Sequence, residues 1–287
     1  MIKLSAFADE AGNGIEEQIA ALRENEIEYV ELRSVDGKNV LNFTDEEVKT
    51  YGDKFKAAGI KVWSIGSPVG KVDISVTEEE FLKDVRRAVE IAKGFGADKI
   101  RMFSFFNAYG AREKVIDLLQ KAADIANKQG VKLCHENEKE IYGDVVDRVL
   151  DLHASVKGLY FVYDPANYMQ CGENARAARE KTQSFTEYYH IKDVLVKTGE
   201  IVPAGAGDGD IAGLAESLKG KDAVLTLEPH LKIFDGYADI DNTEMKNKFE
   251  FKTNREAFDC AVKSLKKVLT DSGYEKVEGG YRNGVRS

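Results

Sequence analysis

The stretch Tyr188-Tyr189-His190-Ile191-Lys192 begins as a short aromatic strand and ends in charged side chains. Alternate side chains of a strand share a face, so His190 and Lys192 point the same way. The same pattern, a short apolar or aromatic run followed by a loop, recurs along the chain. Its occurrences start near Ile2, Tyr29, Lys61, Lys99, Lys132, Leu159, Tyr188 and Ala223.

The segments between these runs have the spacing of amphipathic helices. One of them places its apolar side chains at i, i+4, i+7, i+8 and i+11: Phe81, Val85, Ala88, Val89 and Ala92. Three helices begin with a capping-box pair: Thr44 with Glu47, Thr77 with Glu80, and Thr253 with Glu256. Alternating strands and helices indicate a parallel sheet, and 287 residues suit a closed barrel, which typically needs about 250.

The sequence therefore predicts an α/β fold, a single (β/α)8 TIM barrel domain over residues 1–287. Two segments fall outside the repeating pattern. Residues 232–252 form a charged insertion after the eighth strand, expected to be a lid or an interface element, so a homo-oligomer is allowed. Residues 273–287 are Gly-rich and polar, and we expect a loosely held C-terminal tail.

The composition limits the classes of binding partner and the cellular compartment that we expect. With 41 basic and 50 acidic side chains the net charge is −9, which argues against nucleic acid and anionic membranes as partners. The three cysteines are widely spaced and odd in number, which favours a reducing cytoplasm over a disulfide framework. The sequence shows no signal-type start and no apolar run of the roughly 18 residues that a membrane span needs.

Charged side chains gather where six of the predicted strands end, and in this fold active sites lie at that end. They are Glu31 and Arg33, Arg101, Glu136 and Glu138, Asp164, His190 and Lys192, and Glu228 and His230. Burying an unpaired carboxylate is costly, so such a cluster needs cations, a metal ion or water.

Four of these residues are candidate metal ligands. Glu136, Asp164 and Glu228 offer three hard oxygen donors and His190 one nitrogen, a mixture that suits Mn²⁺, Mg²⁺ or a similar divalent ion, with Zn²⁺ as an alternative. The other interpretation is an ion-pair network in which the same four residues pair with Arg33, Arg101 and Lys192. His135 alternates away from Glu136 and is expected to pack or to support the site.

Two glycine-containing loops lie among the predicted strands and helices. Residues 66–71 do not have the spacing of a phosphate-binding loop, although Lys71 could still reach a substrate. Residues 205–210, Gly-Ala-Gly-Asp-Gly-Asp, match neither a dinucleotide nor a calcium motif, and predict a turn that passes close to the site.

Four features resemble the xylose isomerase-like TIM barrels. They are HxKD at His190 to Asp193, the EN at Glu136 and Asn137, the aspartate that ends the sixth strand, and LEPH at Leu227 to His230. That superfamily, also known as the AP endonuclease family 2 type, includes sugar isomerases, ketose 3-epimerases, sugar-phosphate isomerase/epimerase homologues, inosose-processing enzymes and endonuclease IV. The resemblance runs from Ile2 to about Leu269. It is specific for the superfamily and does not name the substrate.

The resemblance implies one divalent metal ion per chain, with Mn²⁺ first and Mg²⁺, Co²⁺ or Zn²⁺ as alternatives. It makes Glu136, Asp164, His190 and Glu228 the ligands, and Glu136 and Glu228 also the residues that move protons. The residues expected on the substrate side are Glu31, Arg33, Ser67, Lys71, Arg101, Lys192 and His230. The chain departs from relatives at Glu138 and Asn167, where histidines are common, and this weakens the transfer of any one sugar specificity.

The function expected on this basis is a metal-dependent isomerase or epimerase. It would act on a ketose or a sugar-like polyol ketone, by proton transfer through an enediolate. The nearer alternative is a metal-dependent lyase acting on a 3-keto glycoside. An endonuclease IV-like nuclease is disfavoured by the acidic charge and by only four histidines, and a non-catalytic sugar-binding protein by the presence of all four ligand types.

Overall fold

A computed structural model describes residues 1–234 and 249–284. The described residues form a closed barrel of eight parallel strands. These are β1 (Ile2–Ala6), β2 (Tyr29–Leu32), β5 (Lys61–Gly66), β6 (Lys99–Met102), β7 (Lys132–Glu136), β8 (Tyr160–Tyr163), β9 (Thr186–Ile191) and β12 (Ala223–Leu227). They pair in the order β12-β9-β8-β7-β6-β5-β2-β1, and β1 pairs again with β12, which closes the barrel. The predicted fold is confirmed.

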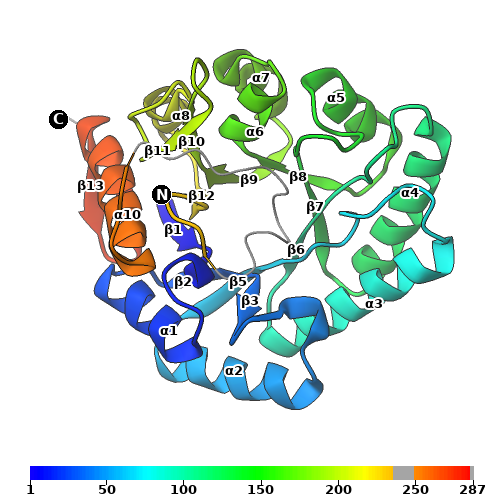
Figure 1. Ribbon diagram of the computed structural model, residues 1–287, viewed down its shortest axis with the longest axis horizontal. Helices are drawn as coiled ribbons and strands as arrows, with labels where there is room; N and C mark the ends of the chain where they lie inside the picture. Colours follow the sequence, from blue (N-terminus) through cyan, green and yellow to red (C-terminus); the bar gives the residue numbers. More distant parts are fainter. Residues whose placement is uncertain (235–248, 285–287) are drawn as a thin grey trace.

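Helices surround the barrel (Figure 1). Within the described residues they are α1 (Ile15–Glu24), α2 (Asp45–Ala57), α3 (Glu78–Phe95), α4 (Arg112–Lys128), α5 (Val146–Ser155), α6 (Pro165–Gln170), α7 (Ala175–Thr182), α8 (Ile211–Ser217) and α10 (Asn254–Asp271), with 3-10 turns η1 (Ala8–Glu10) and η2 (Val40–Asn42). The apolar positions predicted for α3, such as Phe81 and Val85, are buried in the main hydrophobic core. The sequence pattern therefore selects the face that each helix turns toward the strands.

Helix ends follow the local chemistry of the sequence. All three predicted capping boxes are formed, at the starts of α2, α3 and α10. Each such cap typically stabilises a helix by about 1 kcal/mol. At the other end of α3, Gly96 adopts a φ of 70°, a conformation in which a side chain would be strained.

The C-terminal segment corrects the expectation of a loosely held tail. Strands β13 (Tyr274–Val277) and β14 (Gly280–Asn283) form an antiparallel hairpin, and β14 pairs with β1 through Tyr281 and Ile2. The side chains of Tyr274 and Tyr281 are buried, and the Tyr274 hydroxyl donates to the carbonyl of Ala215. The burial of two aromatic rings explains why this polar segment is ordered.

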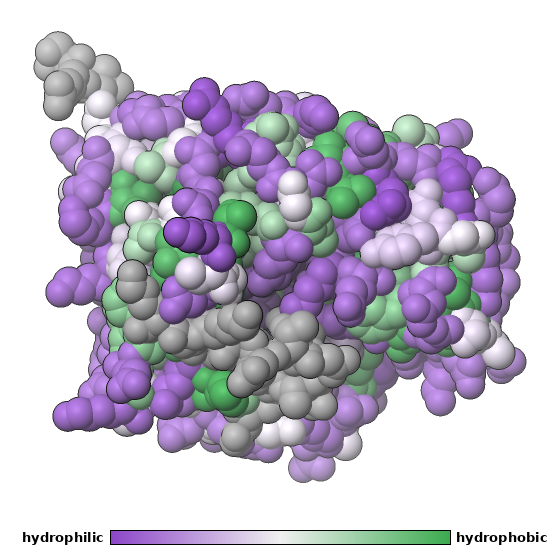
Figure 2. Space-filling view, turned by 45° about the horizontal axis from the view of Figure 1, so that its top comes forward, coloured by the Kyte–Doolittle hydropathy of each residue, from purple (hydrophilic) through white to green (hydrophobic). Residues whose placement is uncertain are grey.

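Two small hairpins extend the loops between barrel elements. They are β3 (Ser34–Val35) with β4 (Lys38–Asn39), and β10 (Asp193–Leu195) with β11 (Glu200–Val202). Most of the predicted lid or interface insertion, residues 235–248, lies outside the described residues. None of the described helices is long and apolar enough to cross a membrane. Figure 2 shows a mainly hydrophilic face on which apolar residues are scattered.

Candidate metal centre

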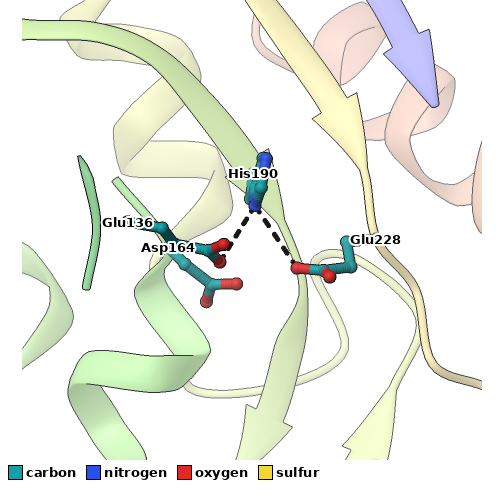
Figure 3. Close-up of side chains that lie close together, drawn as sticks. All are labelled: Glu136, Asp164, His190 and Glu228. Carbon is teal, nitrogen blue, oxygen red and sulfur yellow. Dashed lines mark hydrogen bonds and ion pairs between the residues drawn. The ribbon is translucent and has the colours of Figure 1, made fainter. Parts of the chain in front are cut away.

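The four predicted ligands meet at the carboxyl ends of four neighbouring strands. Glu136 ends β7, Asp164 follows β8, His190 lies in β9 and Glu228 follows β12. All four are buried, and one nitrogen or oxygen atom of each can be chosen so that the four atoms lie within 4.8 Å of one another. Figure 3 shows the three carboxylates and the imidazole turned toward a common point.

His190 is held on both of its ring nitrogens. Its Nδ1 lies 3.0 Å from Oε1 of Glu136 and 3.3 Å from Oε2 of Glu228. Its Nε2 lies 3.1 Å from Oε2 of Glu31, and the other oxygen of Glu31 accepts from the Tyr188 hydroxyl at 2.7 Å. The imidazole therefore presents Nδ1 to the cluster and Nε2 to a buried acceptor, which is the usual arrangement of a metal-binding histidine.

The charges around His190 explain its proton affinity. Burial alone would lower the pKa of His190, but the carboxylates of Glu136 and Glu31 outweigh burial and hold the pKa well above its ordinary value. Glu136 responds in the opposite direction. Burial would raise the pKa of Glu136, whereas His190 and Arg101 lower it to about 2 despite repulsion from Glu228. The ring and the carboxylate thus form a charged pair in the metal-free protein.

Asp164 and Glu228 complete the cluster with different proton affinities. Burial, above all, raises the pKa of Asp164 to about 6, although Lys192 opposes it. Burial would also raise the pKa of Glu228, but Lys192 and His190 hold it well below its usual range. Glu228 is therefore ionised at neutral pH in spite of its burial.

Two oxygens of the cluster, Oδ2 of Asp164 and Oε2 of Glu228, are buried and accept no hydrogen bond. Their cationic neighbour is Lys192, whose ammonium group lies at 3.1 and 3.6 Å. Divalent ions bind oxygen at roughly 2.0 to 2.6 Å, so ligands on opposite sides of an ion lie roughly 4 to 5 Å apart. The 4.8 Å spread of the cluster agrees with that spacing. The residues present therefore fit a hard divalent ion.

The alternative interpretation, an ion-pair network, is also visible in the contacts. Arg101 lies 2.9 Å from Glu136, Arg33 lies 3.2 Å from Glu228, and Lys192 lies 3.1 Å from Asp164. Lys192 lies against Oδ2 of Asp164 and Oε2 of Glu228, two of the oxygens that could bind an ion. An ion and the side-chain cations would therefore compete for the same carboxylates.

The remaining predicted substrate-side residues divide into two groups. Arg33, Arg101, Lys192 and His230 border the cluster, and ring nitrogen Nε2 of His230 lies 3.6 Å from Oε1 of Glu228. Lys71 lies further out, where its ammonium group is 3.0 Å from Glu138.

Two predicted substrate-side residues make contacts that support the site instead. The hydroxyl of Ser67 donates to the backbone carbonyl of Arg101 at 2.6 Å, which ties the loop after β5 to β6. Glu31 is fully buried beside His190. For both residues, contact with a substrate stays a prediction.

Asn137 and Asn167 hold the candidate ligands in place, a role that the sequence patterns did not predict. Asn137 and the backbone of Asp164 exchange two hydrogen bonds of 2.9 Å. Asn167 donates to Oε1 of Glu136 and to the carbonyl of Asn137. The backbone of Asn167 also donates to Oδ1 of Asp164. The ends of β7 and β8 are thereby fixed relative to each other.

An acidic pair after β1 was also missed. Asp9 receives two hydrogen bonds from Arg33, and Glu10 accepts from the backbone N–H of His230 at 2.8 Å. Burial, above all, raises the pKa of Glu10 to about 8, although Arg33 opposes it. The sequence signal that could have identified this pair is the presence of two consecutive acidic residues shortly after a predicted strand.

The remaining histidines lie away from the cluster, as expected. His135 is buried, and its Nε2 is 2.8 Å from the hydroxyl of Ser104. Its pKa is lowered to about 3, chiefly by burial. His153 is exposed and stacks on Phe185 with a centroid distance of 3.8 Å.

The loop at residues 205–210 is organised by Asp193. The Asp193 carboxylate accepts from the backbone N–H groups of Gly205, Gly207 and Gly209 at 2.8 to 3.0 Å, and also from Val194. A Cβ atom at Gly207 or Gly209 would lie 2.4 or 2.7 Å from an oxygen of Asp193, so this close approach requires glycine. A turn is therefore present at these residues, whereas its closeness to the carboxylate cluster stays a prediction.

A (β/α)8 barrel with three buried carboxylates and a histidine at its mouth defines the class of this protein. A family model described as "Xylose isomerase-like TIM barrel" matches residues 19–269, and the chain belongs to this family. The resemblance inferred from the sequence motifs is confirmed. A search of curated proteins gives no match.

Solved structures agree with the fold. The probable 3-DHS dehydratase AsbF from Bacillus anthracis matches with a TM-score of 0.71 at 15% identity, covering 94% of this chain and 99% of that chain. The IolI protein with a zinc atom matches at 0.72 and 16%, covering 94% and 99%. An L-ribulose 3-epimerase matches at 0.71 and 17%, covering 94% and 95%. At these identities the likeness shows the fold alone.

Proposed function

We propose that the chain is a divalent-metal-dependent enzyme that isomerises or epimerises a ketose or a sugar-like polyol ketone. Family membership and the structural likeness to an L-ribulose 3-epimerase support a sugar-processing activity. The observation that carries the proposal is the placement of two ionised glutamates, Glu136 and Glu228, beside the same nitrogen of His190.

The ion would be held by Glu136, Asp164, His190 and Glu228. Three carboxylates and one imidazole favour Mn²⁺, with Mg²⁺, Co²⁺ or Zn²⁺ as alternatives. The IolI protein, which has a similar fold, binds a zinc atom, and this supports a divalent ion in the present chain. When bound, such an ion supplies Lewis-acid polarisation of carbonyl and hydroxyl oxygens.

Proton transfer is assigned to the two glutamates. They come from β7 and β12, which are separated in the barrel by β8 and β9, and they approach Nδ1 of His190 from different sides (Figure 3). A substrate lying between them would present opposite faces of its reacting carbon. One carboxylate can remove the proton beside the carbonyl, and the other can return a proton from the opposite face, which is the requirement for inversion.

Neighbouring cations would stabilise the charge that develops during proton removal. Arg33, Arg101 and Lys192 are all buried next to the cluster. In a site from which water is excluded, fixed charges of this kind stabilise an enediolate oxygen more strongly than water does. Lys192 and Arg101 approach Glu228 at 3.6 and 3.9 Å, so they lie within reach of a substrate at that carboxylate.

A lyase that starts with the same proton removal is the second candidate. The observation in its favour is Glu10, whose pKa of about 8, raised mainly by burial, keeps its carboxyl group protonated at neutral pH. A neutral carboxylic acid can donate a proton to a departing hydroxyl or alkoxide. Both candidate reactions would make the protein an enzyme. The acidic chain gives no support to a nuclease.

The test is a screen of ketoses, ketose phosphates and 3-keto glycosides with Mn²⁺ in D₂O, followed by NMR. An isomerase or epimerase places deuterium at the reacting carbon. A lyase instead produces an unsaturated ketone, which absorbs in the ultraviolet. Turnover without deuterium incorporation would count against proton transfer with solvent exchange, and would indicate a hydride shift or a shielded proton.

A further inference from the structure

Two buried cations at the mouth depend entirely on the candidate metal ligands for their ion pairs. Arg101, in β6, has Nη1 2.9 Å from Glu136 and 3.9 Å from Glu228. Lys192, directly after β9, has Nζ 3.1 Å from Asp164 and 3.6 Å from Glu228. Among the described residues, the carboxylates within 4.0 Å of these two cations all belong to the candidate ligand set.

Arg33 at the same mouth is arranged differently. It also touches Glu228, but both edges of its guanidinium are bound by Asp9, with N–O distances of 2.9 and 3.0 Å. Asp9 is not a candidate ligand. Arg33 therefore keeps a dedicated acidic partner whether or not the cluster holds an ion, whereas Arg101 and Lys192 do not.

A divalent ion changes the local balance of charge. Glu136, Asp164 and Glu228 carry three negative charges, and Arg101 and Lys192 carry two positive ones. With an ion of charge +2 added and His190 neutral as a ligand, the net charge of this group becomes positive. The ion and the two side-chain cations then compete for the same carboxylate oxygens, and the ion is the stronger competitor because it binds them directly.

Apart from the ligand carboxylates, Glu31 acts on the charge of Arg101, but from more than 4.0 Å away. Its guanidinium lies between two rings, with the Cζ atom 5.2 Å from the centre of Phe7 and 4.7 Å from that of Phe103. Its buried Nε has no hydrogen-bond partner, and Nη2 donates only to the carbonyl of Gly66. A planar guanidinium with an unused donor matches the paired oxygens of a carboxylate or phosphate.

We propose that Arg101 and Lys192 bind an anionic group of the substrate, a carboxylate or a phosphate ester, once a divalent ion occupies the carboxylate cluster. The inference rests on the metal site of the proposed function and narrows its substrate class to acidic sugars or sugar phosphates. Arg101 supplies the planar pair of donors, and Lys192 supplies a point charge on the other side of the cluster. Neutral ketoses would leave both cations without a full partner.

Calorimetric titration of the full-length chain tests this with four probes. These are fructose, fructose 6-phosphate, 5-ketogluconate and inorganic phosphate. With Mn²⁺ loaded, at least one anionic probe should bind about 10-fold or more tightly than fructose, the size expected for a charge-assisted bidentate contact. Metal-free protein should lose most of this preference, because Arg101 and Lys192 then pair with the ligand carboxylates. A preference for fructose 6-phosphate or for 5-ketogluconate distinguishes phosphate from carboxylate.

Variants test whether Arg101 and Lys192 cause the preference for anionic probes. Arg101→Gln should remove most of it, and Arg101→Lys should restore part of it. Lys192→Gln should weaken anion binding as well. Arg112→Gln, at an exposed arginine paired with Asp151 outside the barrel, is the matched control and should change nothing. Circular dichroism and manganese content verify that each variant is folded and loaded.

The inference is overturned if the loaded wild type binds no anionic probe more tightly than fructose. It is also overturned if the preference survives in the Arg101→Gln, Lys192→Gln double variant. Solvent deuterium exchange keeps the two proposals separate. Exchange into a neutral ketose without anion preference would support the isomerase proposal and contradict the anion site. A Mn²⁺-dependent anion preference without exchange into any probe would support the anion site and contradict the proposed proton transfer.

Discussion

Oε2 of Glu31 lies 3.1 Å from Nε2 of His190 and thereby determines which nitrogen of the imidazole faces the carboxylate cluster. Glu31 is itself fixed, because Tyr188 donates its hydroxyl to the other oxygen at 2.7 Å. Phe7 meets the imidazole edge-on at 5.2 Å. The ring orientation is thus set by Phe7, which follows β1, and by residues of β2 and β9 before any ion binds.

Removing this acceptor should weaken metal binding. In Glu31→Ala the ring can rotate and its Nε2 proton loses its acceptor, so Mn²⁺ affinity should fall about 10- to 100-fold. Glu31→Gln keeps an acceptor oxygen and should fall less. Titration of metal-free protein with Mn²⁺, followed by electron paramagnetic resonance, measures both affinities.

His190→Ala should give the weakest metal binding among these variants. Loss of a direct ligand should remove most of the metal, more than Glu31→Ala does. Elemental analysis of the purified variants gives the content per chain. Wild-type metal content in His190→Ala would remove this residue from the site, and an unchanged affinity in Glu31→Ala would mean that the contact does not orient the ring.

Glu10 predicts a pH dependence of stability in the metal-free protein. Its pKa is raised from 4.5 to about 8, chiefly by burial, so between these values the unfolded chain has released a proton that the folded chain still holds. The contribution of Glu10 to stability is present below about pH 4.5 and is lost as the pH rises toward 8. A full proton corresponds to a slope of about 1.4 kcal/mol per pH unit.

The variant Glu10→Gln should lack this slope. Urea denaturation at pH 5, 6, 7 and 8 gives the free energy of unfolding, and the difference between wild type and variant should shift in favour of the variant as the pH rises. Glu79→Gln, at an exposed position of α3, is the control and should show a constant difference. A constant difference for Glu10→Gln would contradict the raised pKa.

The alternation of side chains along strands carried most of the prediction of the site. Glu136 and His190 are strand residues, and Asp164 and Glu228 each follow a strand directly, so period two and the barrel geometry suffice to bring them together. The local rules also fixed the capped helix starts. These features depend on residues close to one another in the sequence.

Contacts between distant segments escaped prediction. The hairpin at the C-terminus is ordered because Tyr281 pairs with Ile2, at the other end of the chain. Glu10 lies in a 3-10 turn, where strand alternation gives no direction for the side chain. The support given by Glu31 to His190 crosses the barrel interior. In each case the partner follows from closure of the barrel, not from a local pattern.

Replacing Asp193 should lower the free energy of unfolding more than replacing Asp208, which lies in the loop that Asp193 holds. It accepts four backbone N–H groups, and in Asp193→Asn an NH₂ group would face donors that need an acceptor. Hydrogen bonds to a charged group contribute about 1.5–3 kcal/mol each, so a loss of about 2–4 kcal/mol is expected. Asp208→Asn, where the carboxylate accepts from Val196, should cost less. Urea denaturation of both variants measures the contrast, and equal losses would contradict it.

The identity of the base is the most direct prediction about chemistry. Oε1 of Glu228 is held by Arg33 at 3.2 Å, whereas Oε2 accepts no hydrogen bond and has Nδ1 of His190 at 3.3 Å and Nζ of Lys192 at 3.6 Å. Oε1 is therefore anchored, and Oε2 is the oxygen that we expect to take the proton. The same surroundings hold the pKa of Glu228 well below its usual range against the effect of burial, led by Lys192, so the carboxylate is ionised but is a weak base. It can remove a proton efficiently only where the product charge is also stabilised.

Glu228→Gln keeps the shape and one oxygen donor but cannot accept the proton. It should retain substantial metal and lose at least about 10²-fold in rate, the lower range for a positioned acid–base group. Asn167→Ala is a useful comparison, because it removes a hydrogen bond to Glu136 without touching Glu228, and should lower the rate less. Metal content by elemental analysis and deuterium exchange by NMR separate loss of the ion from loss of the base. Near-normal turnover by Glu228→Gln with full metal content would transfer the role of base to another residue, and Glu136, whose Oε1 also faces His190, would be the next to replace.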